Sequence, residues 1–201
     1  IRLARVFQEA FEEIEDSAKP VVAAVAGNVV GGALELAMAC HYRVAAAGAR
    51  LGMPEVTLGI NPAAGGTQRL PRLAGPETAL RMLLTGAVVD AVHALESGLV
   101  DAVLPGGQEL DGARQLLSSA PVRKTRERED KVSDPAARNA AYAKASEIIA
   151  RVRPEVVAPQ KILDCVRTGL EESFAAGLRR EQTAFAECMD TLGAQNKIHL
   201  F

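Results

Sequence analysis

The sequence has no tryptophan, and aromatic residues make up only 3% of its 201 residues. It has no apolar run close to the roughly 20 residues that a helix needs to cross a bilayer, so we expect no membrane span. Lys and Arg number 23 against 25 Asp and Glu, so no basic excess suggests nucleic acid as a partner. With 48% hydrophobic residues, the chain is nevertheless expected to fold rather than to be disordered.

Cysteines are few and unpaired in sequence. Cys40, Cys165 and Cys188 form no CxxC pair, and the three histidines are scattered, so no metal site is predicted. An odd number of unpaired thiols is typical of a reducing compartment, which indicates a cytoplasmic location. The sequence also contains no GxGxxG, GxSxG or HExxH motif and no Walker A lysine, which argues against nucleotide binding.

Alanine is abundant instead, with 36 residues, so the core is expected to contain small aliphatic side chains. Apolar spacing predicts strands over 21–26, 42–47 and 99–104, and helices over 2–16, 33–40, from 67 onward, 76–85, 91–97, 135–152, 155–168 and 171–190. Residues 27–32 and 48–66 are predicted to be loops, because glycine and proline recur in them.

The composition changes near residue 120. We expect an α/β core over 1–120 and a helical C-terminal region or linker over 121–201, packed on that core because a pair of helices alone buries too little surface. Between them, residues 123–130 form a run of mixed charge. We interpret the run as a solvated loop or linker, with a partner-binding patch as the less favoured alternative.

Three short segments contain residues suited to chemistry. In the first, Gly31 and Gly32 precede a predicted helix that has Glu35 in its first turn, where N–H groups without internal partners can face an anion. In the second, Glu55 follows Pro54 in a loop. In the third, Gly65-Gly66 precede another helix and could again offer free N–H groups. Taken alone, Glu35 could merely complement the helix dipole, and Glu55 could be a surface residue.

Taken together, these segments resemble the enoyl-CoA hydratase/isomerase (crotonase) family. The resemblance extends from Lys19 to Pro105, and it is carried by KPVVAAV (19–25), GGALELA (31–37), PEVTLG (54–59), GGTQRL (65–70), LTG (84–86) and ALESGLV (94–100). It implies an α/β fold of the crotonase type, which is a spiral of β-β-α units, here followed by a helical C-terminal region.

A finer resemblance is to the hydratase part of multifunctional fatty-acid oxidation enzymes. It is carried by His41-Tyr42-Arg43, and by residues 174–181 and 199–201, which look like the linker helix into a second half. This implies a 3-hydroxyacyl-CoA dehydrogenase downstream as a partner domain, or else a homo-oligomer. The first residue is Ile1 rather than Met, so we also expect the natural protein to begin further upstream.

The resemblance implies a role for each motif. Gly32 would donate one N–H to the thioester oxygen, and the family's second donor would lie before residue 1, so residues 1–201 alone are expected to be a poor hydratase. Glu35 would activate the water that adds to C3, and Glu55 would protonate C2. The substrate-binding positions are Gly31, Pro54 and Ala63. Alanine replaces the family's usual glycine at 33 and 63, which adds a methyl group beside the site.

The implied function is hydration of trans-2-enoyl-CoA to 3-hydroxyacyl-CoA in fatty-acid β-oxidation. No cofactor is implied, because coenzyme A is part of the acyl-CoA substrate. One alternative is another acyl-CoA enzyme of the same superfamily, such as an enoyl-CoA isomerase, a hydrolase or a decarboxylase, but the presence of both glutamates argues against it. A different class, a non-catalytic acyl-CoA-binding or assembly module, also stays open. A ClpP-like serine peptidase is disfavoured because no convincing Ser/His pair is present.

Overall fold

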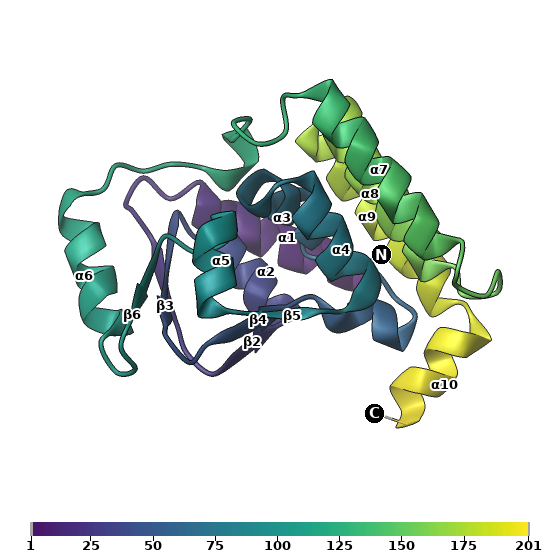
Figure 1. Cartoon of the computed structure of the whole chain (residues 1–201), viewed down its shortest axis with the longest axis horizontal. Helices are drawn as coiled ribbons and strands as arrows, with labels where there is room; N and C mark the ends of the chain where they lie inside the picture. Colours follow the sequence, from purple (N-terminus) through teal and green to yellow (C-terminus); the bar gives the residue numbers. More distant parts are fainter. Residues whose placement is uncertain (1, 201) are drawn as a thin grey trace.

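The centre of the fold consists of two sheets of three short strands each, in a computed structural model that describes residues 2–200 (Figure 1). The first sheet joins β1 (Val22–Val25), β3 (Tyr42–Ala46) and β6 (Ala102–Leu104), and all its strands are parallel. The second joins β2 (Asn28–Val30), β4 (Arg50–Gly52) and β5 (Val88–Asp90), in which β5 runs antiparallel to β4.

Successive turns of the chain add one strand to each sheet and then a helix. The first turn is β1, β2 and α2 (Gly32–Ala39), and the second is β3, β4 and α3 (Gly66–Ala74), with the short 3₁₀ helix η1 (Pro54–Leu58) before α3. Val22 lies opposite Tyr42 and Asn28 opposite Arg50, so the two turns are in register. The predicted spiral of β-β-α units is therefore confirmed.

Two segments predicted to be loops contain strands. Residues 27–32 include β2, and residues 48–66 include β4 and η1. Strand β2 has only three residues, and it lies between Gly27 and Gly31, which both adopt positive φ. The glycines at both ends are typical of a loop, so the sequence predicts a loop there although the short apolar run between them forms a strand. The predicted strand over 99–104 was also too long, because β6 begins only at Ala102.

The next helices follow their capping signals. Helix α4 (Pro76–Thr85) ends at Gly86, and α5 (Ala91–Ser97) begins after Asp90, whose side chain accepts the N–H of His93. Gly86 and Gly98 both adopt the left-handed conformation that closes a helix. Helix α6 (Glu109–Ser119) was not predicted; only Ala113 is fully buried in it, so its apolar face is weak.

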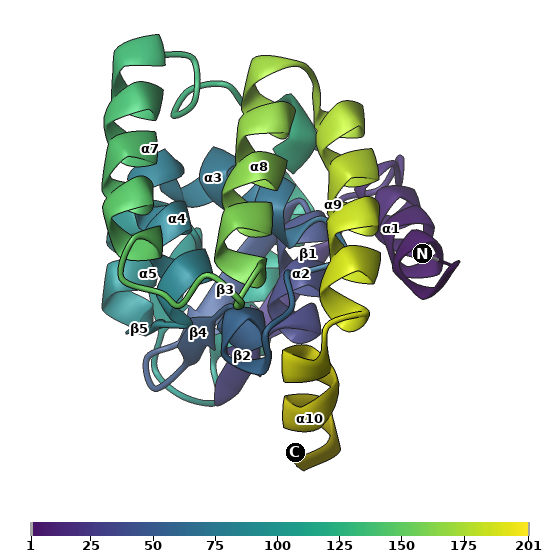
Figure 2. The same ribbon diagram turned by 90° about the vertical axis from the view of Figure 1, so that its right-hand side faces the viewer.

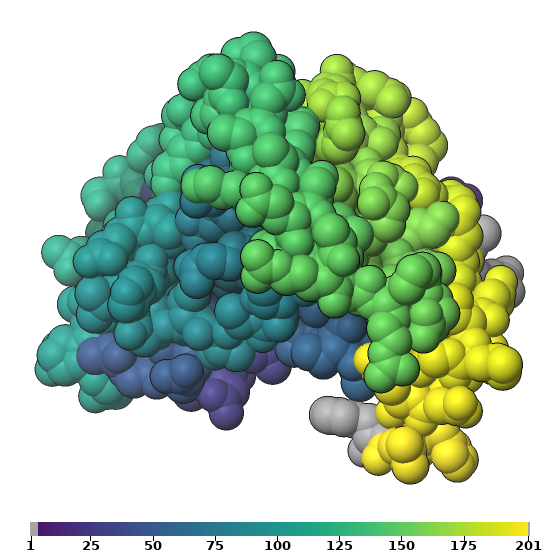
Figure 3. All heavy atoms as spheres, turned by 45° about the vertical axis from the view of Figure 1, so that its right-hand side comes forward, coloured from purple at the N-terminus to yellow at the C-terminus, as the bar shows by residue number. Residues whose placement is uncertain are grey.

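The C-terminal region consists of α7 (Pro135–Ile149), α8 (Ala158–Glu171), α9 (Phe174–Met189) and α10 (Leu192–Leu200). Helices α7, α8 and α9 lie side by side across one face of the α/β part, and α10 projects beyond them (Figures 2 and 3). Tyr142, Ile162 and Val166 belong to the same buried cluster as Leu70 and Leu83, so one hydrophobic core extends to both sides of residue 120. None of the helices within residues 2–200 combines the length and apolarity of a membrane span.

The charge run at 123–130 is a loop with one short helix and several exposed residues, as predicted, but part of it is packed against the core. Thr125, in the short helix η2 (Thr125–Glu127), is buried and donates its hydroxyl to the carbonyl of Met38. Lys124 and Arg126 form ion pairs with Asp16, and Arg123 pairs with Asp101. The basic residues of the charge run thus pair with acidic residues from distant parts of the chain.

Helix α1 (Arg2–Glu15) ends in a fully buried carboxylate. Oε2 of Glu15 accepts two hydrogen bonds from Arg69 of α3, at 2.8 and 3.2 Å, and both side chains are 0% exposed. Oε1 of Glu15 accepts the backbone N–H of Arg126 at 2.7 Å. This one side chain therefore joins α1, α3 and the charge run.

We predict that Glu15→Gln lowers the free energy of unfolding by about 3 kcal/mol, because it leaves the Arg69 charge buried without its partner. Urea denaturation measures the change. Glu9→Gln is the matched control, since Glu9 lies on the same helix in an exposed pair with Arg5 and should change stability by less than about 1 kcal/mol. Equal losses in the two variants would contradict the importance of the buried pair.

Candidate active site

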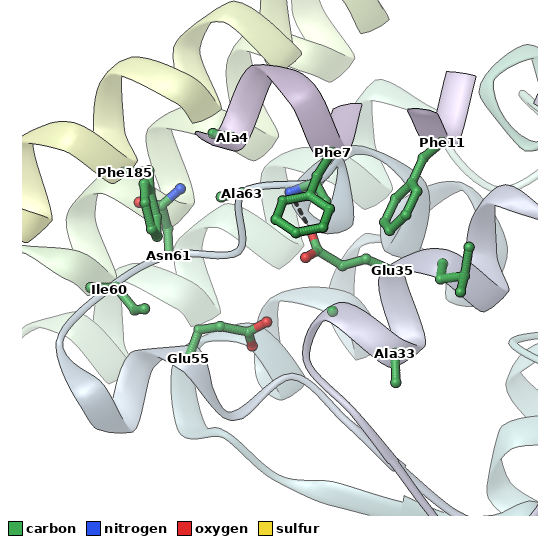
Figure 4. Close-up of a pocket in the computed structure, with 13 residues that line it drawn as sticks. Ala4, Phe7, Phe11, Ala33, Glu35, Glu55, Ile60, Asn61, Ala63 and Phe185 are labelled. Atoms are coloured by element: carbon green, nitrogen blue, oxygen red, sulfur yellow. Dashed lines mark hydrogen bonds between the residues drawn. The ribbon is translucent and has the colours of Figure 1, made fainter. Parts of the chain in front are cut away.

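A cavity of about 430 Å³ opens between α1, the start of α2, η1, the 60–64 segment and α9. Its apolar lining includes Phe7, Phe11, Leu36, Ile60 and Phe185, and its polar lining includes Glu35, Glu55 and Asn61. Figure 4 shows the carboxyl groups of Glu35 and Glu55 directed into the same space, with the rings of Phe7 and Phe185 at its sides. Two acidic groups thus meet in a largely apolar pocket.

Glu35 is held by backbone groups from another element. It lies in the first turn of α2 and is only 4% exposed. Its Oε1 accepts the N–H of Ala64 at 2.8 Å and the N–H of Gly66 at 2.7 Å. Burial raises the pKa of Glu35, whereas these two N–H groups and the charge of Arg69 act in the opposite direction. Burial is the largest of these effects, so the pKa of Glu35 is raised overall, and the two N–H groups offset part of that rise.

Glu55 has a different environment. It is the second residue of η1, after Pro54, and its Oε2 is buried without a hydrogen-bond partner among the described residues. Burial, and to a smaller extent the charge of Glu35, raise the pKa of Glu55 to about 8. Oδ1 of Asn61 is also buried and unpaired within that part of the chain. Two polar atoms of residues that line the cavity thus lack a hydrogen-bond partner among the described residues.

The start of α2 faces the cavity with unbonded backbone. Gly31 adopts φ 58° and ψ −131°, a conformation that side chains oppose, and a Cβ there would lie 3.2 Å from Oε1 of Glu55. The N–H of Gly32 makes no hydrogen bond to any described residue, and Gly32 itself lines the cavity. A free helix N-terminal N–H beside two carboxyl groups can stabilise negative charge that develops on a bound oxygen.

The predicted site residues lie near one another, at different depths. Glu35, Glu55, Gly32 and Ala63 line the cavity, whereas Gly31 and Pro54 lie behind it and set the backbone that carries Gly32 and Glu55. Their chemical roles stay predictions. The prediction of free N–H groups at Gly65-Gly66 was wrong, because both are bonded: Gly66 donates to Glu35, and Gly65 donates to Glu181.

Sequence reasoning missed the aromatic wall and the groups that hold Glu35. Phe7, Phe11 and Phe185 line the cavity, although the whole chain has only five phenylalanines. The rarity of phenylalanine could have pointed to an aromatic pocket, but the positions of Phe7 and Phe11 are also explained by the apolar stripe of a helix. The role of the Ala64 backbone N–H cannot be recognised from the sequence, since every residue type except proline has a backbone N–H.

We predict that Glu55→Gln stabilises the protein more at pH 8 than at pH 5. The folded protein keeps the Glu55 proton up to a pKa of about 8, whereas an unfolded glutamic acid releases it near its ordinary pKa of 4.5. Between these values the unfolded state binds fewer protons, so the stability of the unchanged protein falls as pH rises through this window. Glutamine removes that loss.

Urea denaturation from pH 4 to pH 9 measures the effect, with Glu96→Gln at an exposed position of α5 as the control. Parallel pH curves for the unchanged protein and Glu55→Gln would contradict a buried, neutral Glu55.

Comparison with known proteins assigns the family. The model described as enoyl-CoA hydratase/isomerase matches residues 3–127. The fatty acid oxidation complex subunit alpha of Shewanella frigidimarina is 41% identical over 184 residues, covering 88% of this chain and 26% of that protein. The peroxisomal fatty acid beta-oxidation multifunctional protein AIM1 of Arabidopsis thaliana is 37% identical over 193 residues, covering 94% and 27%. The chain thus spans about a quarter of the length of these relatives.

Solved structures agree with this assignment. An enoyl-CoA hydratase from Bacillus anthracis is 28% identical with a TM-score of 0.56, over 100% of this chain and 66% of that one. An enoyl-CoA hydratase from Mycobacterium avium subsp. paratuberculosis, at 18% identity, shares the fold with a TM-score of 0.68, over 99% of this chain and 69% of that one. The fold, the ordered motifs and the family match together show that this chain belongs to the enoyl-CoA hydratase/isomerase family.

Proposed function

We propose that the cavity hydrates trans-2-enoyl-CoA thioesters to 3-hydroxyacyl-CoA in fatty-acid β-oxidation. The observation that carries this proposal is the pair of carboxyl groups at one cavity in unlike environments. Glu35 accepts two N–H groups, whereas Glu55 has a buried oxygen without a partner among the described residues and a pKa raised to about 8. Environments that differ in this way suit one base and one acid.

In the proposed reaction, the carboxylate of Glu35 accepts a proton from water as the water oxygen bonds to C3. The C2–C3 double bond becomes an enolate, whose oxygen accepts the N–H of Gly32. Glu55, which keeps its proton at neutral pH, donates it to C2. The substrate gains one water in total, and the proton on Glu35 returns to Glu55 through solvent before the next turnover.

The apolar wall supports an acyl substrate. Phe11 is 8% exposed, while Phe7 and Leu36 at the cavity are 48% and 41% exposed, so the lining extends from the buried carboxylates to the surface. An alkyl chain gains hydrophobic burial along such a surface. Proton transfer and water addition need no redox or electrophilic group beyond the thioester, so we propose no cofactor and no metal.

The alternatives fit the site less well. Isomerisation moves a proton between two carbons and can use a single carboxyl group, whereas this cavity brings two together; an isomerase activity at the same site is compatible with the pair. A non-catalytic acyl-CoA-binding module would gain nothing from burying Glu35 and Glu55 beside an apolar pocket, because each burial disfavours the charged form.

Partners and location stay proposals. The relatives named fatty acid oxidation complex subunit alpha and multifunctional protein extend well beyond the matched region, which supports a longer assembly with the predicted dehydrogenase. A homo-oligomer is the alternative. A cytoplasmic location is compatible with the bacterial relative, whereas the plant relative is named peroxisomal.

We predict that Glu35→Gln and Glu55→Gln each lower kcat by about 10²–10⁴-fold with little change in KM, since an amide occupies the same space but cannot exchange the proton. Loss of the conjugated thioester absorbance of a short trans-2-enoyl-CoA measures turnover. Glu13→Gln, at an exposed position of α1, is the control and should retain full activity. Unchanged turnover in either variant would remove that residue from the mechanism, and tight thioester binding without turnover by the unchanged protein would favour the binding module.

A further inference from the structure

A third buried glutamate lies behind the catalytic pair, and the mechanism above does not use it. Glu181 belongs to α9 in the C-terminal region and is 0% exposed. Its Oε1 accepts the N–H of Gly65 at 2.6 Å and Nε2 of Gln8 at 3.0 Å. Its Oε2 accepts the N–H of Thr67 at 3.0 Å and the Thr67 hydroxyl. Four donors on one buried carboxyl group is a complete set of partners.

The donors of Glu181 alternate with those of Glu35 along one stretch of backbone. The N–H groups of Ala64 and Gly66 point to Glu35, and those of Gly65 and Thr67 point to Glu181. The stretch is the N-terminus of α3, where N–H groups lack partners inside the helix. Gly65 adopts φ 100°, so the chain turns there and sends adjacent N–H groups in different directions.

The orientation of one set of donors therefore depends on the other set. If Thr67 and Gly65 lost their acceptor, the start of α3 could rotate, and the N–H groups of Ala64 and Gly66 would no longer be aimed at Glu35. Gln8 of α1 further restricts this rotation of the start of α3, because its Nε2 donates both to Glu181 and to the carbonyl of Ala63, at 3.0 and 3.1 Å.

We propose that Glu181 is a positioning residue for the hydration reaction, which acts by holding the start of α3 so that two backbone N–H groups fix the Glu35 carboxylate in the cavity. This inference rests on the proposed catalytic role of Glu35. It assigns to a helix of the C-terminal region a function in the chemistry of a site whose predicted residues lie between 31 and 63.

Charge also couples the two carboxyl groups, and the test below separates this coupling from the effect through the backbone. Burial, and then the charge of Glu35, raise the pKa of Glu181 to about 8, so the two carboxyl groups resist being ionised together. The other titratable or charged groups that face the pair are Glu55 of η1, Arg69 of α3, Glu15 of α1 and Cys165 of α8. The charge of Arg69 favours the ionised form of Glu35, but Arg69 is paired with Glu15, so backbone N–H groups are the direct hydrogen-bond donors to Glu35.

The test is Glu181→Gln in the full chain. The amide nitrogen of glutamine cannot accept an N–H, so either Gly65 or Thr67 loses its acceptor while side-chain volume is kept. Glu187→Gln is the matched control, because Glu187 lies on the same helix at the surface, paired with Lys161. Two measurements are made on each variant: kcat and KM for a trans-2-enoyl-CoA, and the pKa of Glu35 from ¹³C carboxyl chemical shifts, assigned with Glu35→Gln.

For Glu181→Gln we expect kcat to fall on the order of 10–100-fold with KM nearly unchanged, as for a small misplacement of a reacting group. We also expect the Glu35 pKa to rise, because its anion loses N–H donors. Thr67→Val replaces the hydroxyl with a methyl group and should give a smaller change in the same direction, whereas Thr67→Ser keeps the hydroxyl and should behave as the wild type. This pair keeps the test sharp if Glu181→Gln folds poorly.

A folded Glu181→Gln protein with an unchanged Glu35 pKa and unchanged kcat would overturn the inference and leave Glu181 a stability residue. A lowered Glu35 pKa would also overturn it, because Glu181 would then act through its charge rather than through the backbone. The NMR titration needs no turnover. An inactive but titrating full-length wild type would therefore count against the proposed function, whereas an active wild type with an unaffected Glu181→Gln variant would count against this inference alone.

Discussion

The start of α3 must bury four consecutive backbone N–H groups away from water, and this requirement organises the molecule around it. Unpaired buried N–H groups are costly, so each needs an acceptor. Two elements far apart in the chain supply them: α2 through Glu35 and α9 through Glu181. Helix α1 adds Gln8 against the same cluster and pairs its Glu15 with Arg69 one helical turn further along α3.

The same constraint explains why the site can hold unlike carboxyl groups. Glu35 shares the donors of α3, whereas Glu55 lies on η1, outside their reach, and has a buried oxygen that no described residue pairs with. Burial alone would push both groups toward the neutral form. Directional N–H donors reach only Glu35, so hydrogen bonding, together with the deeper burial of Glu35, distinguishes the two groups.

Sequence reasoning reached the fold through motifs with a strong local cause. The caps at Asp90, Gly86 and Gly98 determine where helices start and end, and the structure follows them. Strands of three residues such as β2 and β4 are too short to show the alternation of apolar and polar residues, so the sequence predicts loops at these positions. They exist because a neighbouring strand supplies the hydrogen bonds, which is a property of the folded chain.

The site, like the fold, could be predicted only where its residues belong to a sequence motif. Glu35, Glu55 and the glycines stood out because they belong to ordered motifs that resemble the family, whereas Glu35 or Glu55 taken alone had an ordinary structural explanation. Glu181 ends the 174–181 segment that resembles a linker helix, but that resemblance gave it no role. It lies in a predicted helix with many other charged residues, such as the exposed Glu187. Only the folded arrangement shows that one carboxylate faces a helix N-terminus and the other faces solvent.

Helix α9 carries both Glu181 and Phe185, one turn apart. Glu181 accepts hydrogen bonds from the backbone segment that holds Glu35, and Phe185 is part of the apolar wall of the cavity. During synthesis the chain leaves the ribosome from its N-terminus, and domains form as their residues emerge. Residues 31–66 are then exposed well before α9, with the N–H groups of Gly65 and Thr67 still hydrated. Both carboxyl groups that carry the proposed chemistry are thus made before α9, and the pocket that Phe185 helps to line is complete only after α9 has docked.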